Sequence, residues 1–167
     1  MNYNDYQRSC RATAIYPAYA QIVYPTISLI DEIGEAEEKM LAVILPAPDE
    51  IVKELGDIMW NVAMLAGDCR IQLEDVVTMS RNYNGVNLFI PAARVAGIVG
   101  KSIRDNNSKI SPDAQAAIMV NLAQVVAAIS FHAGYYGSTL DEVCALNLAK
   151  LKSRADRGVI SGSGDNR

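Results

Sequence analysis

Residues 50–69 read EIVKELGDIMWNVAMLAGDC, and this stretch decides the fold. Its apolar residues recur at intervals of three and four, which is the spacing of one face of an α-helix. Asp49 has the side chain of a good N-cap residue, so the pattern predicts a helix from Glu50 to about Cys69. The apolar positions of the stripe are Ile51, Leu55, Ile58, Met59, Val62 and Leu65.

Helical patterns also cover the rest of the chain, and no stretch shows the alternation typical of a strand. Pro46 and Pro48 end the helix that precedes residue 50. Ser111 followed by Pro112 and the capping box Thr139-x-x-Glu142 open the last two helices. The sequence therefore predicts an all-α protein. The expected helices span residues 5–15, 26–45, 50–69, 73–82, 90–104, 112–136 and 140–155.

The helical pattern contains an internal repeat. Gly67-x5-Leu73-Glu74-Asp75-Val76 matches Gly134-x5-Leu140-Asp141-Glu142-Val143. The repeat predicts a duplicated helical hairpin, with the two hairpins closing into a four-helix bundle. We expect a single domain with an N-terminal arm, two repeats and a flexible tail. The boundaries of these four parts are 1–25, 26–83, 86–156 and 157–167.

Composition limits the class of protein. A chain of 167 residues, half of them hydrophobic, can form one domain with its own core. A net charge of −4 argues against a general nucleic-acid binder. The three cysteines are far apart in sequence, so they predict reduced thiols rather than a disulfide framework. The polar start lacks a signal core, and no uncharged apolar run reaches the length of a membrane span. We expect a cytoplasmic protein.

Acidic residues gather on two consecutive helices. Residues 31–38 hold five acids, of which Glu32 and Glu35 are three apart and share a helix face. Glu54 and Asp57 repeat this spacing on the next helix. The short connection makes the two helices antiparallel neighbours, so the two pairs are predicted to face each other across one groove.

Four close carboxylates repel one another, and Glu54 and Asp57 lie among apolar residues where desolvation is costly. A divalent cation removes this conflict. Carboxylate oxygens are hard ligands that suit Mg²⁺ or Mn²⁺ rather than zinc. The alternative is a solvated acidic helix face with no ligand.

The pattern Glu32-x-x-Glu35 followed by Glu54-x-x-Asp57 resembles the signature of the MazG-like all-α nucleoside triphosphate pyrophosphohydrolases. Residues 53–60, KELGDIMW, look like the second metal-binding helix of that family. The stretches 5–17, 147–158 and 162–167 are similar to the beginning and end of many bacterial and phage members.

The resemblance implies a MazG-like four-helix fold and an enzyme. Mg²⁺, with Mn²⁺ as a substitute, would be held by Glu32, Glu35, Glu54 and Asp57. The metal would bind a nucleoside triphosphate and activate water for attack at the α-phosphorus, which releases pyrophosphate. Glu35 and Glu38 are the candidate catalytic residues, with Glu38 as a further ligand or as the base. Among nucleotides, purines and in particular guanine are the first to assay.

The second repeat lacks the acids. Asn121 and Gln124 stand where Glu54 and Asp57 stand in the first repeat. We therefore expect one active site per chain, with residues 86–156 as a degenerate scaffold repeat. Association into a homodimer or homotetramer is a further expectation.

Basic residues near the C-terminus are candidates for contact with the substrate. Lys150, Arg154 and Arg157 lie four and three apart, so they form one helical stripe that could bind phosphates. The alternative is a solvated helix end favoured by the helix dipole. Asn61 lies on the same helix face as Asp57 and could bind the sugar or base, or be a satisfied polar residue. Two rival functions remain: a catalytically idle nucleotide-binding regulator, and a phosphohydrolase that releases orthophosphate.

Overall fold

The structure, a computed structural model, describes residues 1–44 and 46–159. Within those residues it contains seven α-helices, one short 3₁₀ helix and no strand, so the all-α prediction is confirmed. The elements are α1 (Tyr3–Thr13), η1 (Ala18–Ala20), α2 (Val23–Leu41), α3 (Pro48–Asp68), α4 (Leu73–Ser80), α5 (Phe89–Asp105), α6 (Pro112–Tyr135) and α7 (Leu140–Asp156).

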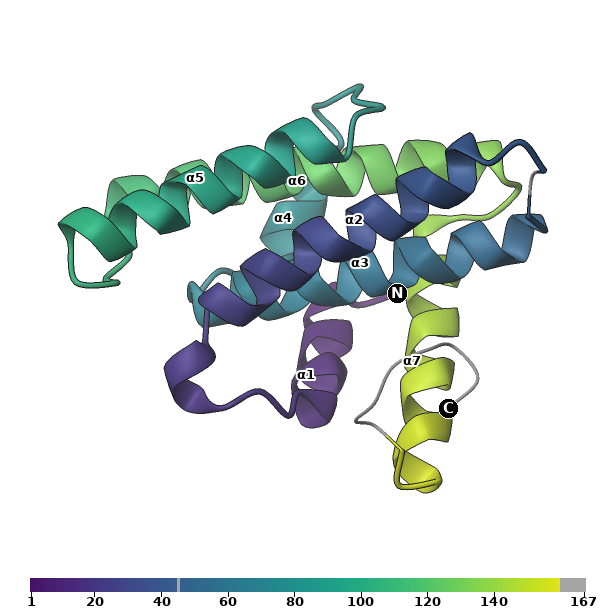
Figure 1. The fold of residues 1–167 in the computed structure, drawn as a ribbon, viewed down its shortest axis with the longest axis horizontal. Coiled ribbons are helices and arrows are strands. Elements are labelled where there is room, and N and C mark those ends of the chain that lie inside the picture. The colour runs from purple at the N-terminus through teal and green to yellow at the C-terminus, as the bar shows by residue number, and fades with distance from the viewer. Residues whose placement is uncertain (45, 160–167) are drawn as a thin grey trace.

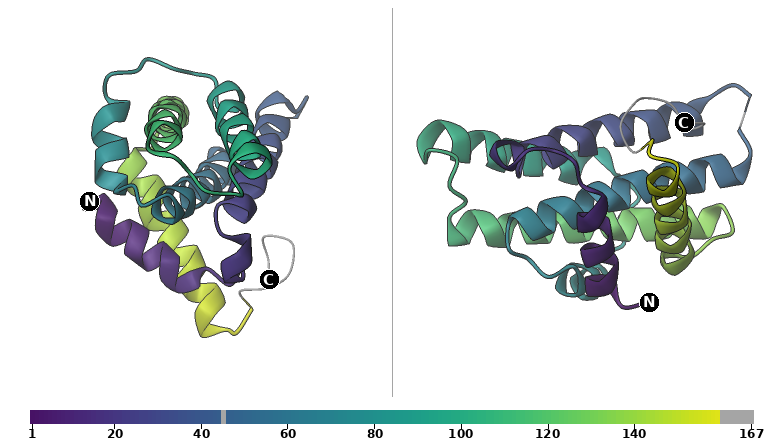
Figure 2. Two further views of the ribbon diagram at one scale, coloured as in Figure 1. Left: turned by 90° about the vertical axis from the view of Figure 1, so that its left-hand side faces the viewer. Right: turned by 90° about the horizontal axis from the view of Figure 1, so that it is seen from below.

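Four long helices form one bundle. α2 packs on α3, α3 on α6, α6 on α5 and α5 on α2, which closes a ring of contacts (Figure 1). The shorter α4 covers α6, while α1 and α7 lie against α3 on the side away from the α5–α6 pair (Figure 2). α3 is therefore surrounded by other helices, and its buried residues include Glu54 and Asn61 as well as the apolar stripe.

The predicted helices are all present, and the starts of α3 and α2 need correction. Asp49 is not the N-cap of α3, because Pro48 occupies the first turn and Ala47 is the cap. Proline suits this position, since its φ is preset for the helix and it has no N–H to leave unsatisfied. Asp49 instead accepts a hydrogen bond from Lys53 at 2.9 Å. α2 begins at Val23 rather than at Thr26, because Pro25 is tolerated in a first turn.

The starts of the last two helices agree with the sequence patterns, and α1 spans Tyr3–Thr13 rather than residues 5–15. Ser111 caps α6, and Thr139 and Glu142 form the predicted capping box of α7. α2 ends at Leu41, because Ala42 already has extended backbone, so the prediction of a helix that continues to Pro46 is wrong. Leu45, the predicted last residue, lies outside the described residues. Most of the predicted flexible tail, from residue 160 onward, also lies outside them.

The predicted repeat has a local counterpart in the structure. The turn after α3 and the turn after α6 contain Arg70 and Gly137, matched residues that both have positive φ. The N–H groups of Ile71 and Ser138 bond at 2.8 Å to carbonyls five residues earlier, which satisfies the ends of both helices alike. The helices that follow differ, since α4 packs on α6 and α7 packs on α3. Duplication of a whole hairpin stays a prediction.

One helix in the described residues, α6, is long and apolar enough to cross a membrane by length and composition. In the bundle, 56 % of its apolar window is buried. Core helices of globular proteins have the same properties.

Candidate metal centre

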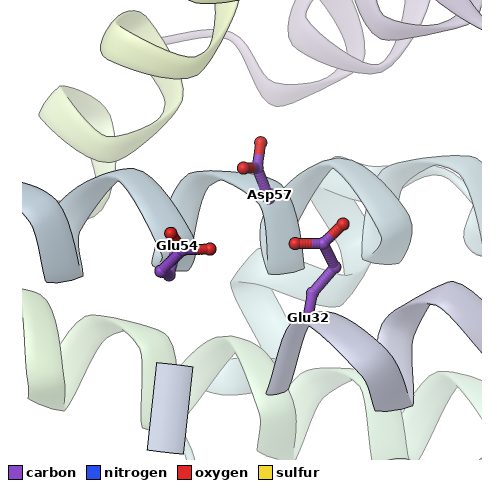
Figure 3. Close-up of side chains that lie close together, drawn as sticks. All are labelled: Glu32, Glu54 and Asp57. Atoms are coloured by element: carbon purple, nitrogen blue, oxygen red, sulfur yellow. The ribbon is translucent and has the colours of Figure 1, made fainter. Parts of the chain in front are cut away.

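Three of the predicted ligands come together between α2 and α3. Carboxylate oxygens of Glu32, Glu54 and Asp57 lie within 4.8 Å of one another, a group we call the carboxylate cluster (Figure 3). The spacing of three residues puts Glu54 and Asp57 on adjacent turns of one face of α3. Glu32 approaches them from α2, which packs against that face.

The surroundings of the cluster disfavour negative charge. Glu54 is only 2 % exposed, and Glu32 and Asp57 are half-buried. Burial, together with the charges of Asp57, Glu35 and Glu54, raises the pKa of the Glu32 carboxyl from 4.5 to about 8, while Lys150 acts in the opposite direction. The site therefore disfavours the charged form of Glu32 beside the other two carboxylates.

Two lysines supply part of the compensation. Lys39, near the end of α2, forms an ion pair with Glu54, and Lys150 on α7 forms one with Asp57. Asp57 also accepts a hydrogen bond from the side-chain amide of Asn147 at 3.1 Å. The cluster is thus a mixed site in which three acids from two helices meet cations from α2 and α7.

The structure separates Glu35 and Glu38 from this group. Both side chains are exposed, and neither belongs to the set of oxygens within 4.8 Å. Glu35 is near enough for its charge to raise the pKa of Glu32. A role for Glu35 as a ligand, and for either residue in catalysis, stays a prediction.

The predicted substrate residues differ in their positions. Lys150 lies at the cluster through its ion pair with Asp57. Arg154 is buried, whereas Arg157 is exposed and donates to the backbone carbonyl of Ser153 at 3.2 Å. The three basic residues therefore do not form one uniformly exposed stripe, although their binding to phosphate stays a prediction.

Asn61 is 1 % exposed and donates its amide to the Asp57 carbonyl at 3.1 Å. Its Oδ1 is buried and accepts no hydrogen bond within the described protein. A buried acceptor without a donor is costly. Its place one turn beyond Asp57 keeps it a candidate for contact with a donor group of a ligand.

Sequence reasoning did not single out Lys39. Lys39 lies seven residues after Glu32 and four after Glu35, so helical spacing puts all three on one face of α2. That spacing was a usable signal, and it could have identified the lysine as a counter-ion for the acids.

Fold and site together define a helical-bundle protein with an acidic cluster between two antiparallel helices. The chain is 35 % identical over 102 residues to the Gene 37 protein of Mycobacterium phage L5, a match that covers 61 % of this chain and 84 % of the phage protein. The chain belongs to the family of that phage protein. No family model and no solved structure matches this chain.

Proposed function

We propose that this protein is a Mg²⁺-dependent nucleoside triphosphate pyrophosphohydrolase of the MazG-like kind. Hydrolysis would convert a nucleoside or deoxynucleoside triphosphate to the monophosphate and pyrophosphate. The observation that carries the proposal is the carboxylate cluster, in which Glu32, Glu54 and Asp57 converge from two helices to within 4.8 Å. A shared divalent ion requires this convergence, and a solvated acidic face does not.

The donor set fits the proposed metal. The cluster offers only carboxylate oxygens, with neither thiolate nor imidazole among the three groups. Hard oxygen ligands of this kind suit Mg²⁺ and Mn²⁺ and disfavour zinc. The raised pKa of Glu32 supports a cation site as well, because Lys39 and Lys150 pair with Glu54 and Asp57 and a third ionised carboxylate in this buried cluster would need a further cation.

When bound, the cation would lower the pKa of a water molecule and offset charge on the triphosphate. The residues of the chain do the remaining work. Lys150, released from Asp57, would contact a phosphate oxygen, as would Arg154 and Arg157 further along α7. Glu35 or Glu38, on the exposed side of α2, would accept the proton of the attacking water. The oxygen of that water bonds to the α-phosphorus, the bond to the bridging oxygen breaks, and pyrophosphate leaves.

The proposal includes a cytoplasmic location, in a bacterium or in a phage-infected host, and a homo-oligomeric state. The relative from a phage supports an origin of this kind. Asn61 would read the sugar or the base through its buried Oδ1. Guanine nucleotides are the first to assay.

The test is a panel of nucleoside and deoxynucleoside triphosphates with Mg²⁺ or Mn²⁺, in which pyrophosphate and orthophosphate are measured separately. Release of pyrophosphate supports the proposal. Orthophosphate alone would identify the rival phosphohydrolase, and binding without turnover would identify the idle regulator.

A pair of variants on α3 assigns the activity to the cluster. Glu54→Gln removes a buried carboxylate of the cluster, and we expect turnover to fall at least about a hundredfold with the helical circular dichroism retained. Glu50→Gln removes an exposed carboxylate one turn earlier and should keep wild-type turnover. Full activity in Glu54→Gln would refute the metal site.

A further inference from the structure

A chain of two hydrogen bonds that begins on α1 reaches Asp57 through α7. The Tyr6 hydroxyl on α1 donates to Asn147 Oδ1 at 2.9 Å, and the Asn147 amide donates to Asp57 Oδ1 at 3.1 Å. Tyr6 is 1 % exposed and Asn147 is 3 % exposed. Three helices that are far apart in sequence, α1, α7 and α3, thus meet in one buried polar path.

The Asp57 carboxylate only accepts hydrogen bonds, so the donor end of the Asn147 amide faces it, and the Tyr6 hydroxyl supports this orientation by donating to Oδ1. An amide has one acceptor end and one donor end, and a hydroxyl that donates to Oδ1 leaves the NH₂ group for Asp57. The reverse orientation would put a carbonyl oxygen against a carboxylate, which is repulsive. A tyrosine hydroxyl is protonated at neutral pH even at its ordinary pKa, and burial raises the pKa of Tyr6 further, so the group is a donor here.

Packing holds Asn147 in the same place. A Cβ added to Gly56 would lie 3.0 Å from Asn147 Cβ, so α7 rests directly on the backbone of α3 beside Asp57. The Asn147 side chain therefore has little freedom to move away from the carboxylate.

We infer that Tyr6 and Asn147 are positioning residues that orient Asp57 toward a divalent cation in the carboxylate cluster. The inference rests on the proposed function, because it assumes that the cluster binds such an ion. The amide occupies Oδ1 and fixes the plane of the carboxylate. The other oxygen, Oδ2, pairs with Lys150 in the metal-free protein, and a cation would bind there in place of that lysine. Hydrogen-bond partners of metal ligands commonly change metal affinity by about 10- to 100-fold.

A purely structural role is the alternative, and Tyr3 provides a matched control. Tyr3 also lies on α1, and its hydroxyl also donates to α7, at Asp141 Oδ1. Asp141 is outside the carboxylate cluster. Removing either hydroxyl therefore breaks one α1–α7 hydrogen bond, but only Tyr6→Phe breaks the path to Asp57.

The experiment measures the affinity of the full chain for Mn²⁺ by calorimetry, with thermal unfolding recorded in the absence of metal. Tyr6→Phe should weaken Mn²⁺ binding about tenfold. Tyr3→Phe should bind Mn²⁺ as the wild type does, even if its Tm falls equally. Asn147→Ala should weaken binding at least as much as Tyr6→Phe, and Asp57→Asn should weaken it most. Raised Mn²⁺ should restore kcat in Tyr6→Phe and not in Glu54→Gln.

The outcomes separate the two claims. Suppose that Tyr6→Phe and Asn147→Ala both bind Mn²⁺ with wild-type affinity while Asp57→Asn loses binding. This result overturns the positioning role and leaves the proposed function unchanged. If the Tyr6→Phe and Asn147→Ala variants bind Mn²⁺ more weakly but the wild type releases no pyrophosphate, the positioning role is supported and the proposed enzymatic function is refuted. A wild-type protein that binds no Mn²⁺ overturns both.

Discussion

Lys39 forms an ion pair with Glu54, a carboxylate that is almost completely buried between α2 and α3. The pair links the two helices that build the carboxylate cluster. Glu54 is therefore both a candidate metal ligand and a buried charge that needs a counter-ion in the protein without metal.

Lys39→Met should destabilise the metal-free protein by about 2–4 kcal/mol, because it leaves the buried Glu54 carboxylate with less compensation. Mn²⁺ should recover part of this loss, so the rise in Tm on adding Mn²⁺ should be larger in the variant than in the wild type. Arg8→Met, which removes the exposed ion pair with Asp5, is the control and should change stability by less than about 1 kcal/mol. Equal Mn²⁺ effects in Lys39→Met and the wild type would count against a metal at Glu54.

Glu32 should make stability depend on pH. Its carboxyl titrates near 4.5 in the unfolded chain and at about 8 in the folded protein. Between these pH values the folded state keeps Glu32 protonated and the unfolded chain does not, so the bound proton favours folding. The stability that this proton supplies is complete at low pH and is lost as the pH rises through about 8. Glu32→Gln, which is neutral at every pH, should therefore raise the Tm in EDTA more at about pH 9 than at about pH 5. A Tm gain that is independent of pH would contradict the raised pKa.

The same group links metal binding to protons. A ligand must lose its proton to bind a cation, so Mn²⁺ affinity should rise by up to about tenfold per pH unit below the pKa of Glu32. Glu32→Gln should bind Mn²⁺ more weakly and with a smaller dependence on pH. Titration calorimetry in buffers of different ionisation enthalpy measures the released proton directly, and no proton release near pH 7 would contradict the prediction.

Gly56 should be intolerant of a side chain. Gly56→Ala gains helix propensity, but its Cβ would lie 3.0 Å from Asn147 Cβ, and α7 must shift to admit it. We expect a net loss of about 1–3 kcal/mol, from urea unfolding. A Cβ added at Gly97 on α5 would have no neighbouring atom within 4 Å, so Gly97→Ala should stabilise the protein by about 0.5–1 kcal/mol. A stable Gly56→Ala would show that α7 moves easily at this contact.

Asp68, at the end of α3, holds the segment that leads into α2. Its buried carboxylate pairs with Arg11 and accepts hydrogen bonds from the Tyr16 hydroxyl and the Ile22 N–H, both at 2.9 Å. Ile22 has a φ of +67°, which is strained for a β-branched residue and needs support from its surroundings.

Asp68→Asn should therefore cost about 2–4 kcal/mol and expose the backbone after Arg11 to trypsin. Asp75→Asn, at an exposed acid on α4, should leave both the stability and the rate of cleavage at Arg11 unchanged. Slow cleavage at Arg11 in Asp68→Asn would show that the segment is held by other contacts.

Much of the fold could be predicted because helix signals are local. The apolar stripe of α3 and the caps Ser111 and Thr139 depend on residues within one or two turns, and the structure confirms them. The Asp49 cap was predicted wrongly, since a good capping side chain and an N1 proline competed for one helix start and the proline prevailed.

The sequence by itself determined that Glu54 and Asp57 share a helix face, because their spacing matches the helical period. Only the tertiary structure decided that Glu32 joins them while Glu35 stays exposed, because that depends on the rotation of α2 against α3. The tertiary structure also decided that Asn147 and Tyr6 form a hydrogen-bonded path to the cluster. Asn147 is 90 residues from Asp57 in the sequence, and Tyr6 is 141 residues from Asn147. Helical periodicity relates residues within a few turns, whereas contacts between distant helices depend on how the whole core packs.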